Sequence, residues 1–175
     1  TDPSVSWTEL AAKRIGIIGM GNIGSRVAKI AEAFGMKVCY YSTSGTGHCT
    51  EYPCLTLEEL LRTSDIVSVH APLNERTQNL LGAREFSMMK PTAYVVNAGR
   101  GAIIVEADLA EAVDNGTIAG AGIDVFVQEP VPEDHPYLKM KHPERMRLAP
   151  HIAWASVEAR QRLVGMMADN VLKGW

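Results

Sequence analysis

"IGIIGMGNIGSRVAKIAEAFG", residues 15–35, joins a continuous apolar run to an amphipathic segment through three closely spaced glycines. The apolar run has the length of a strand, and Ile23, Val27 and Ile30 recur at helical spacing before a stop at Gly35. The stretch therefore predicts a strand, a tight turn and a helix.

The glycines follow the pattern GxGxxG between a strand and a helix, which is the context that a dinucleotide-binding turn requires. Gly19 permits the tight turn, Gly21 lets a pyrophosphate approach the backbone, and Gly24 lets the helix pack closely on the strand. Asn22 and Ile23 open the helix, whose free N–H groups and dipole favour phosphate. We therefore expect these residues to bind a dinucleotide.

Apolar strands and amphipathic helices continue to alternate along the rest of the chain. Further strands are predicted at residues 36–41, 65–72, 93–99, 118–126 and 145–152, and further helices at residues 56–64, 83–90, 106–116 and 156–175. Thr56 with Glu59 forms a capping box, and Ser156 is the expected cap of the last helix. Such alternation predicts an α/β fold, a Rossmann-type doubly wound parallel sheet, with residues 1–175 forming a single domain.

Composition and charge restrict the class of protein. The 175 residues are 46% hydrophobic with a net charge of −3, and the basic residues are scattered, so we expect no nucleic-acid partner. Residues 1–10 lack the features of a signal peptide and the apolar runs are only strand-sized, so we expect no membrane partner and a cytoplasmic location. Cys39, Cys49 and Cys54 suit reduced thiols, and their spacing to His48 does not indicate a metal site.

The residue that follows the second strand bears on cofactor preference. Ser42 stands close to where an Asp or Glu would bind the ribose 2′-hydroxyl of NAD and repel the 2′-phosphate of NADP. Ser42, Thr43 and Ser44 can donate hydrogen bonds to a phosphate, but no Arg or Lys follows them directly. NAD and NADP therefore both remain open.

Three polar residues each follow a predicted strand in the second half of the chain: Arg100, Glu129 and His151. Because the carboxyl ends of parallel strands form the ligand crevice of an open sheet, these side chains can converge there. A guanidinium binds a carboxylate, an imidazole exchanges a proton, and a carboxylate holds the imidazolium. The set suits reduction of a 2-oxo acid, although each residue alone is an ordinary surface charge or loop histidine.

Five blocks of sequence carry a family resemblance. They read "IGIIGMGNIGSRVA", "SDIVSVHAPLNERTQNLL", "VVNAGRGAIIVEADLAEAV", "AGAGIDVFVQEP" and "LAPHIAWASVEAR". In this order they resemble the NAD(P)-binding domain of the D-2-hydroxyacid dehydrogenases, and "HIAWAS" is similar to the glycerate dehydrogenases, also called hydroxypyruvate reductases. The resemblance implies hydride transfer between NAD(P)H and a small 2-oxo or 2-hydroxy acid, such as hydroxypyruvate, D-glycerate or glyoxylate.

The resemblance also implies roles for single residues. Arg100 would bind the substrate carboxylate and keto oxygen, His151 would be the acid and base, and Glu129 would hydrogen-bond to His151. Asp124 would contact the nicotinamide carboxamide, although a strand-end carboxylate also commonly caps a turn. The remaining residues implied by the resemblance are Ala71, Pro72, Asn97 and Ala98 along the cofactor groove and Trp154 as a wall of the substrate pocket.

The chain departs from the family pattern in a second respect besides Ser42. Family members carry a substrate domain built from segments before and after the cofactor domain, and we expect this domain to be absent from residues 1–175. The chain alone is then expected to bind cofactor with little turnover, and the resemblance allows a homodimer. Two alternatives are a dinucleotide-sensing module like the co-repressors of this fold, and an NADP reductase whose substrate has no carboxylate.

Overall fold

The fold is built around one parallel sheet in the computed structural model, which describes residues 8–173. The strands are β1 (Arg14–Ile18), β2 (Lys37–Tyr41), β3 (Ile66–Val69), β4 (Tyr94–Asn97), β5 (Gly120–Ile123) and β6 (Met146–Leu148), in the order β2-β1-β3-β4-β5-β6. The strand order reverses at β1, because β2 lies on one side of it and β3 on the other. This switch point confirms the doubly wound parallel fold.

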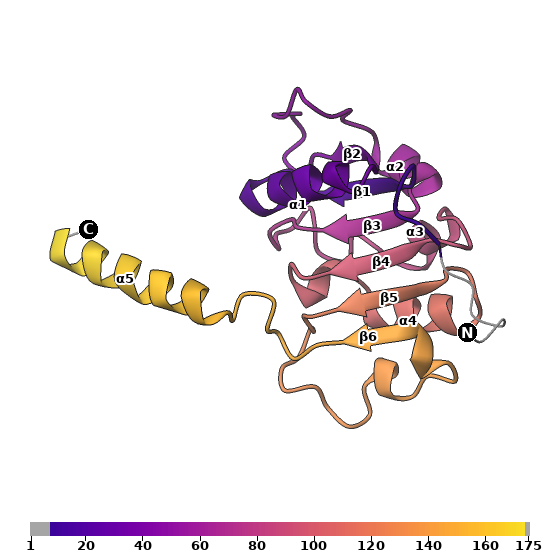
Figure 1. Ribbon diagram of the computed structural model, residues 1–175. Helices are drawn as coiled ribbons and strands as arrows, with labels where there is room; N and C mark the ends of the chain where they lie inside the picture. The colour runs from indigo at the N-terminus through magenta and orange to yellow at the C-terminus, as the bar shows by residue number, and fades with distance from the viewer. Residues whose placement is uncertain (1–7, 174–175) are drawn as a thin grey trace, which may run out of the picture.

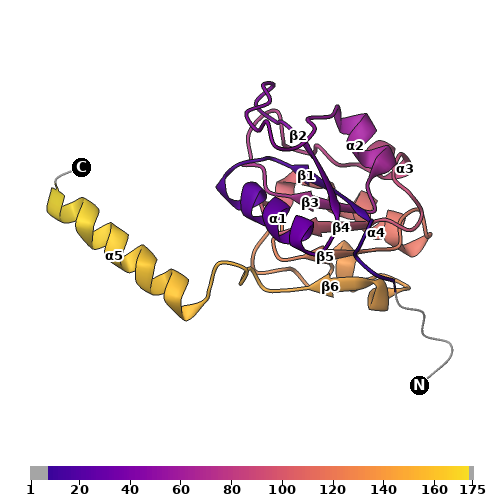
Figure 2. The same ribbon diagram turned by 45° about the horizontal axis from the view of Figure 1, so that its top comes forward.

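Helices cover both faces of the sheet (Figures 1 and 2). They are α1 (Asn22–Ala33), α2 (Leu57–Thr63), α3 (Ala83–Ser87) and α4 (Glu106–Asp114). The chain also contains the helix α5 (Val157–Lys173), which does not cover the sheet, and the short 3-10 turns η1 (Gly101–Ile103), η2 (Pro136–Leu138) and η3 (Pro143–Arg145). One core cluster lies under α1, and a larger one lies between the sheet and α2, α3 and α4. The sheet is therefore buried between two helical layers, as its apolar strands predict.

Small residues, rather than large apolar ones, form the inner face of α1. Gly24, Ala28 and Ala31 are buried against the sheet, whereas Ile23 and Ile30 are exposed. A Cβ on Gly24 would collide with the carbonyl oxygen of Gly19, so the helix approaches the strand too closely for larger side chains. Val27 packs against the core while Ile23 and Ile30 do not, so the apolar period located this helix correctly but identified only part of the face that it buries.

The helix caps lie where the sequence predicts them, whereas several strands end earlier than predicted. Glu59 N–H donates to Thr56 Oγ1 at 3.2 Å in the expected capping box, and Ala159 N–H donates to Ser156 Oγ at 3.1 Å. The strands predicted at residues 118–126 and 145–152 are shorter, ending at Ile123 and Leu148. Beyond Leu148 one further ladder bond forms, from Ala149 N–H to Ile123 C=O at 2.9 Å, before Pro150.

The long helix α5 extends away from the rest of the protein (Figure 1). It has no buried residue over Val157–Lys173. Residues 174–175 of the predicted helix, and residues 1–7 of the predicted domain, lie outside the described residues. Within residues 8–173, no helix combines the length and the hydropathy needed to cross a bilayer.

Candidate active site

The glycine turn leaves open space at the start of α1. Gly19 has φ +94°, in the left-handed region, and a Cβ there would lie 2.8 Å from Ala71 Cα. A Cβ on Gly21 would meet no atom within 4 Å. The backbone at Gly21 therefore faces free space beside a helix N-terminus, which is the shape that a pyrophosphate needs.

A pocket of about 400 Å³ connects this turn to the carboxyl ends of β3 and β4. It is lined by Ile23, His70, Ala71, Pro72, Leu73, Ala98, Gly99 and Arg100. Several residues that the sequence assigned to the cofactor groove thus lie around one pocket, together with the proposed substrate-binding arginine.

His70 is a member of this pocket that the sequence did not single out. It directly follows β3, and its Nε2 lies 2.9 Å from Ser68 Oγ. Burial lowers the pKa of His70, because the charged imidazolium loses solvation. His70 is therefore a neutral wall of the pocket near pH 7, and only its place after a buried strand could have marked it in the sequence.

Asn97 is buried and shapes the loop that presents Arg100. Its side-chain oxygen accepts from Gly99 N–H at 3.0 Å, and its side-chain nitrogen donates to Arg100 C=O at 3.0 Å. The oxygen and the nitrogen of the Asn97 side chain are thus both hydrogen-bonded within the loop. The side chain of Arg100 is exposed beside the pocket, where Nη1 donates to Gly99 C=O at 2.8 Å.

His151 and Glu129 lie together beyond β5 and β6. His151 Nδ1 is 2.8 Å from Glu129 Oε2, and Phe126 N–H donates to Glu129 Oε1 at 3.0 Å. The bond from His151 holds the pKa of Glu129 below its ordinary value, with smaller contributions from Phe126 N–H and from the charges of His151 and Arg100. Glu129 is therefore a carboxylate at neutral pH, and it places a proton on Nδ1 while leaving Nε2 available to a substrate.

The backbone at His151 is held in an unusual conformation. His151 has φ +54°, which is uncommon for a residue other than glycine. Both carboxylate oxygens of the buried Asp124 accept from the next two amides, Ile152 N–H at 2.8 Å and Ala153 N–H at 2.9 Å. Asp124 thus caps this turn, as the alternative reading of its sequence position allowed, and its contact with a carboxamide stays a prediction.

Trp154 completes the same turn. Its indole N–H donates to His151 C=O at 2.9 Å, while the residue remains 53% exposed. The indole is therefore fixed at one end and presents an apolar face to solvent beside His151, and its role as a pocket wall stays a prediction.

The loop after β2 contacts an arginine, Arg76, that was not predicted to lie near it. Arg76 Nη1 donates to Ser44 C=O at 3.2 Å, although the two residues lie 32 positions apart. The residues next to Ser42 in the sequence do not include this arginine, because Arg76 belongs to the loop after β3.

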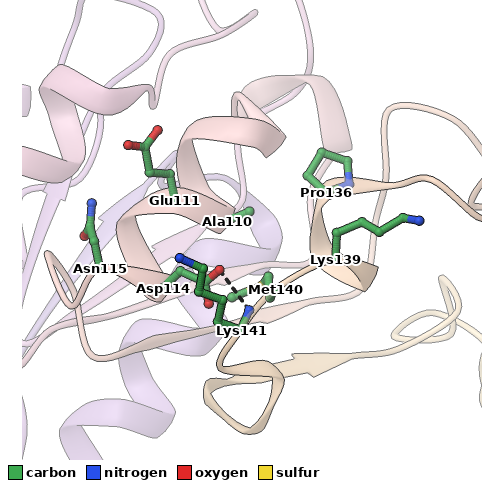
Figure 3. A pocket seen from close by; sticks show the side chains of 8 residues that line it. All are labelled: Ala110, Glu111, Asp114, Asn115, Pro136, Lys139, Met140 and Lys141. Carbon is green, nitrogen blue, oxygen red and sulfur yellow. Dashed lines mark hydrogen bonds between the residues drawn. The ribbon is translucent and has the colours of Figure 1, made fainter.

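A separate pocket of about 390 Å³ lies beside the carboxyl end of α4 and η2. Figure 3 shows its lining, where Lys141 N–H donates to Asp114 at 3.0 Å. None of the residues predicted from the sequence to be functional lines this pocket. Among residues 8–173, no three His, Cys, Asp or Glu side chains gather in a way that could hold a metal ion.

Comparison with known proteins gives one consistent family. The family model described as "D-isomer specific 2-hydroxyacid dehydrogenase, NAD binding domain" matches residues 1–153. The chain is 46% identical over 169 residues to a glyoxylate reductase of Aeropyrum pernix, covering 94% of the chain and 49% of that protein. It is 40% identical over 163 residues to a glycerate dehydrogenase of Methylorubrum extorquens, covering 93% and 50%.

The fold is also shared with solved structures. An acyclic imino acid reductase in complex with NADPH and D-Arg superposes with a TM-score of 0.88 at 34% identity, covering 98% of this chain and 53% of that one. The chain thus spans about half the length of the relatives that it matches. These relatives are named for catalysis, so they do not support a binding module without turnover.

Proposed function

The chain belongs to the D-isomer specific 2-hydroxyacid dehydrogenases, whose NAD-binding domain it carries, and we propose that it binds NAD(P)H in the groove beside Gly21. We further propose that it supplies Arg100, Glu129 and His151 to the reduction of a small 2-oxo acid. Cofactor binding is proposed for the chain itself. Turnover is proposed for a full-length enzyme in which a substrate domain completes the cleft over residues 1–175.

The observation that carries this proposal is the 2.8 Å bond between His151 and Glu129. It lies beyond the carboxyl ends of the strands, and the charge of the pocket residue Arg100 contributes to the lowered pKa of Glu129. A cationic carboxylate binder, a proton donor and an ionised partner therefore lie close together at the edge where ligands bind in such sheets.

The side chains act on the substrate in a simple order. Arg100 binds the substrate carboxylate and orients the keto group toward the cofactor groove. When bound, NAD(P)H supplies the hydride that reduces the keto carbon. His151 donates the proton on Nε2 to the keto oxygen as that oxygen becomes a hydroxyl, and Glu129 stabilises the charged imidazole before the transfer. In the reverse direction the same imidazole accepts the proton.

Glyoxylate and hydroxypyruvate are the proposed substrates, the corresponding hydroxy acids being glycolate and D-glycerate. Two similar relatives are named for these compounds, one as a glyoxylate reductase and one as a glycerate dehydrogenase. Both substrates place a carboxylate next to the carbonyl group that is reduced, so Arg100 can bind both in the same way. A reductase whose substrate lacks a carboxylate would give Arg100 no such role.

The proposed cofactor site is tested by replacing Gly21 with valine. Because a Cβ at Gly21 would occupy the open space in front of the backbone, Gly21→Val should abolish binding of NADH and NADPH, measured by nicotinamide fluorescence. Unfolding curves should show that the variant remains folded, because that Cβ meets no protein atom within 4 Å. A folded Gly21→Val variant that binds both cofactors normally would contradict the assignment.

A further inference from the structure

The loop after β2, residues 42–50, is rich in hydroxyl side chains and contains no acidic residue. Residues 42–50 read "STSGTGHCT" and contain no Asp or Glu. Ser42 Oγ lies 3.1 Å from Ser44 Oγ, which in turn lies 3.1 Å from His48 Nε2. Ser42 Oγ also donates to Thr46 C=O at 2.5 Å, so these hydroxyl groups lie close together at the carboxyl end of a strand and have a neutral carbonyl as their acceptor.

Arg76 belongs to a turn, residues 72–77, that hydrogen bonds and a buried side chain hold in place. Thr77 is fully buried, and its hydroxyl donates to Pro72 C=O at 2.6 Å. Asn74 Oδ1 accepts from Arg76 N–H at 2.9 Å, which fixes the backbone from which the guanidinium extends. Since Pro72 also lines the proposed cofactor pocket, the position of Arg76 is tied to the rim of that groove.

The approach of Arg76 to the loop is close. Its Nη1 bonds to Ser44 C=O at 3.2 Å, and a Cβ on Gly45, whose φ is +87°, would lie 3.8 Å from the same nitrogen. The guanidinium is exposed and its partner is a neutral carbonyl. An anion that entered between the loop and Arg76 would therefore replace a weak partner with a charged one.

A further pocket places the loop next to the glycine turn. This pocket, of about 300 Å³, is lined by Met20 and Ser25 from the turn and α1, and by His48, Cys49, Thr50 and Glu51 from the loop. The loop thus lies on the β2 side of the turn, where a dinucleotide fold holds the ribose of the adenosine half. The nearest acidic residues in the sequence are Glu51 and Glu75, which flank the cluster without interrupting it.

We propose that Arg76, together with the hydroxyl groups of Ser42 and Ser44, binds the 2′-phosphate of NADP(H), so that this chain prefers NADPH to NADH. The inference rests on the proposed cofactor site and adds its specificity. A guanidinium pairs with phosphate through two parallel hydrogen bonds, and serine hydroxyls can donate to the remaining oxygens. A carboxylate at position 42 would repel the phosphate, and serine does not.

The test is a pair of titrations with NADPH and NADH on the 175-residue chain, read by nicotinamide fluorescence. The unaltered chain should bind NADPH about tenfold or more tightly than NADH, the scale of one charge-assisted contact. Arg76→Ala should remove most of this difference by weakening NADPH alone. In addition, 2′,5′-ADP should displace NADH from the unaltered chain at much lower concentration than it does from Arg76→Ala.

Arg62 offers a matched control. It is an exposed arginine on α2, paired only with Glu58 at 2.9 Å, so Arg62→Ala removes the same charge away from the loop. This variant should leave both affinities unchanged. Ser42→Asp is the complementary change, since it should weaken NADPH by repulsion and strengthen NADH by accepting from the 2′-hydroxyl.

The outcomes separate this inference from the function on which it rests. Equal binding of NADH and NADPH, preference for NADH, or equal loss of both in Arg76→Ala would overturn the role of Arg76 while leaving cofactor binding in place. Failure of the unaltered chain to bind either cofactor would instead overturn the proposed cofactor site.

Discussion

Of the three histidine–glutamate pairs within residues 8–173, two have surroundings that differ sharply. In the first, His151 Nδ1 lies 2.8 Å from Glu129 Oε2, and the side chains are 37% and 38% exposed. In the second, His135 Nε2 lies 3.1 Å from Glu106 Oε2, and the side chains are only 4% and 14% exposed. The same two residue types thus meet at an open edge in the first pair and inside the protein in the second.

The buried pair uses its hydrogen-bonding groups for structure. His135 Nδ1 accepts from Tyr137 N–H at 3.2 Å, so the ring proton must lie on Nε2, facing Glu106. That contact is short but poorly aligned, since His135 Nε2 lacks a partner with hydrogen-bond geometry. The ring also packs against Phe126 and Tyr137, with centroids 5.7 Å and 4.8 Å away.

Both pairs act on one short segment of chain. Phe126 N–H donates to Glu129, and the next amide, Val127 N–H, donates to Glu106 Oε1 at 2.9 Å. The buried pair therefore anchors the segment from which the exposed pair extends. The comparison indicates that a histidine beside a glutamate can donate a proton to a substrate only where one ring nitrogen remains accessible, whereas a buried one supports the structure.

The largest expected difference between the pairs is in stability. His135→Ala removes a ring packed among aromatic side chains and leaves Glu106 buried with one partner fewer, so it should lower the free energy of unfolding by about 2–4 kcal/mol. Urea unfolding curves measure this. His151→Ala is the matched control, and it should change stability by less than about 0.5 kcal/mol because His151 is exposed. Equal losses in the two variants would show that burial does not distinguish the pairs.

A smaller difference is expected in the pH dependence of reduction. The bond from His151 lowers the pKa of Glu129, so an ionised carboxylate lies beside the imidazole that must donate the proton. Glu129→Gln in the full-length enzyme should therefore lower the pH above which reduction fails. The measurement is the pH profile of kcat for glyoxylate. Glu106→Gln should leave the upper pH limit of reduction unchanged. A shift of the same size in Glu106→Gln would contradict the assignment of proton transfer to the exposed pair alone.

The smallest expected effect is on stability in acid. The pKa of Glu129 is lower in the folded chain than its ordinary value, so its contribution to stability is complete above the ordinary pKa and is lost as the pH falls through the folded-state pKa. Between about pH 5 and about pH 3 the unaltered chain should lose slightly more stability than Glu129→Gln. The effect is small because solvent screens an exposed pair. Unfolding curves of both proteins at each pH measure this effect. A difference in free energy of unfolding that stays constant with pH would contradict it.

Local patterns made most of the fold predictable. The strand, glycine turn and helix at residues 15–35, and the capping box at Thr56 and Glu59, depend on neighbours in sequence, and the structure has them where they were expected. Strand ends were less predictable, because an apolar run continues beyond the last ladder bond. The inner face of α1 was identified only in part, because the close contact of Gly24 with Gly19 leaves room for small side chains and places Ile23 and Ile30 in solvent.

The candidate site was predictable where its residues follow strands. His151 and Glu129 follow the last two strands, and their convergence follows from the parallel topology. Arg76 was missed because its contact with Ser44 depends on two loops meeting across 32 positions. The pair of His135 and Glu106 was missed for the same reason, since no periodic pattern relates a helix start to a distant 3-10 turn.

The central claim is that His151 donates the proton during hydride transfer, and the turnover of His151→Ala tests it most directly. In the full-length enzyme, kcat for glyoxylate and hydroxypyruvate should fall by roughly two to four powers of ten, the scale of a positioned acid. The affinity of the same variant for NADPH should stay within about twofold of the unaltered value, since His151 lies outside the groove at the glycine turn. Normal turnover by a folded His151→Ala enzyme would contradict the account.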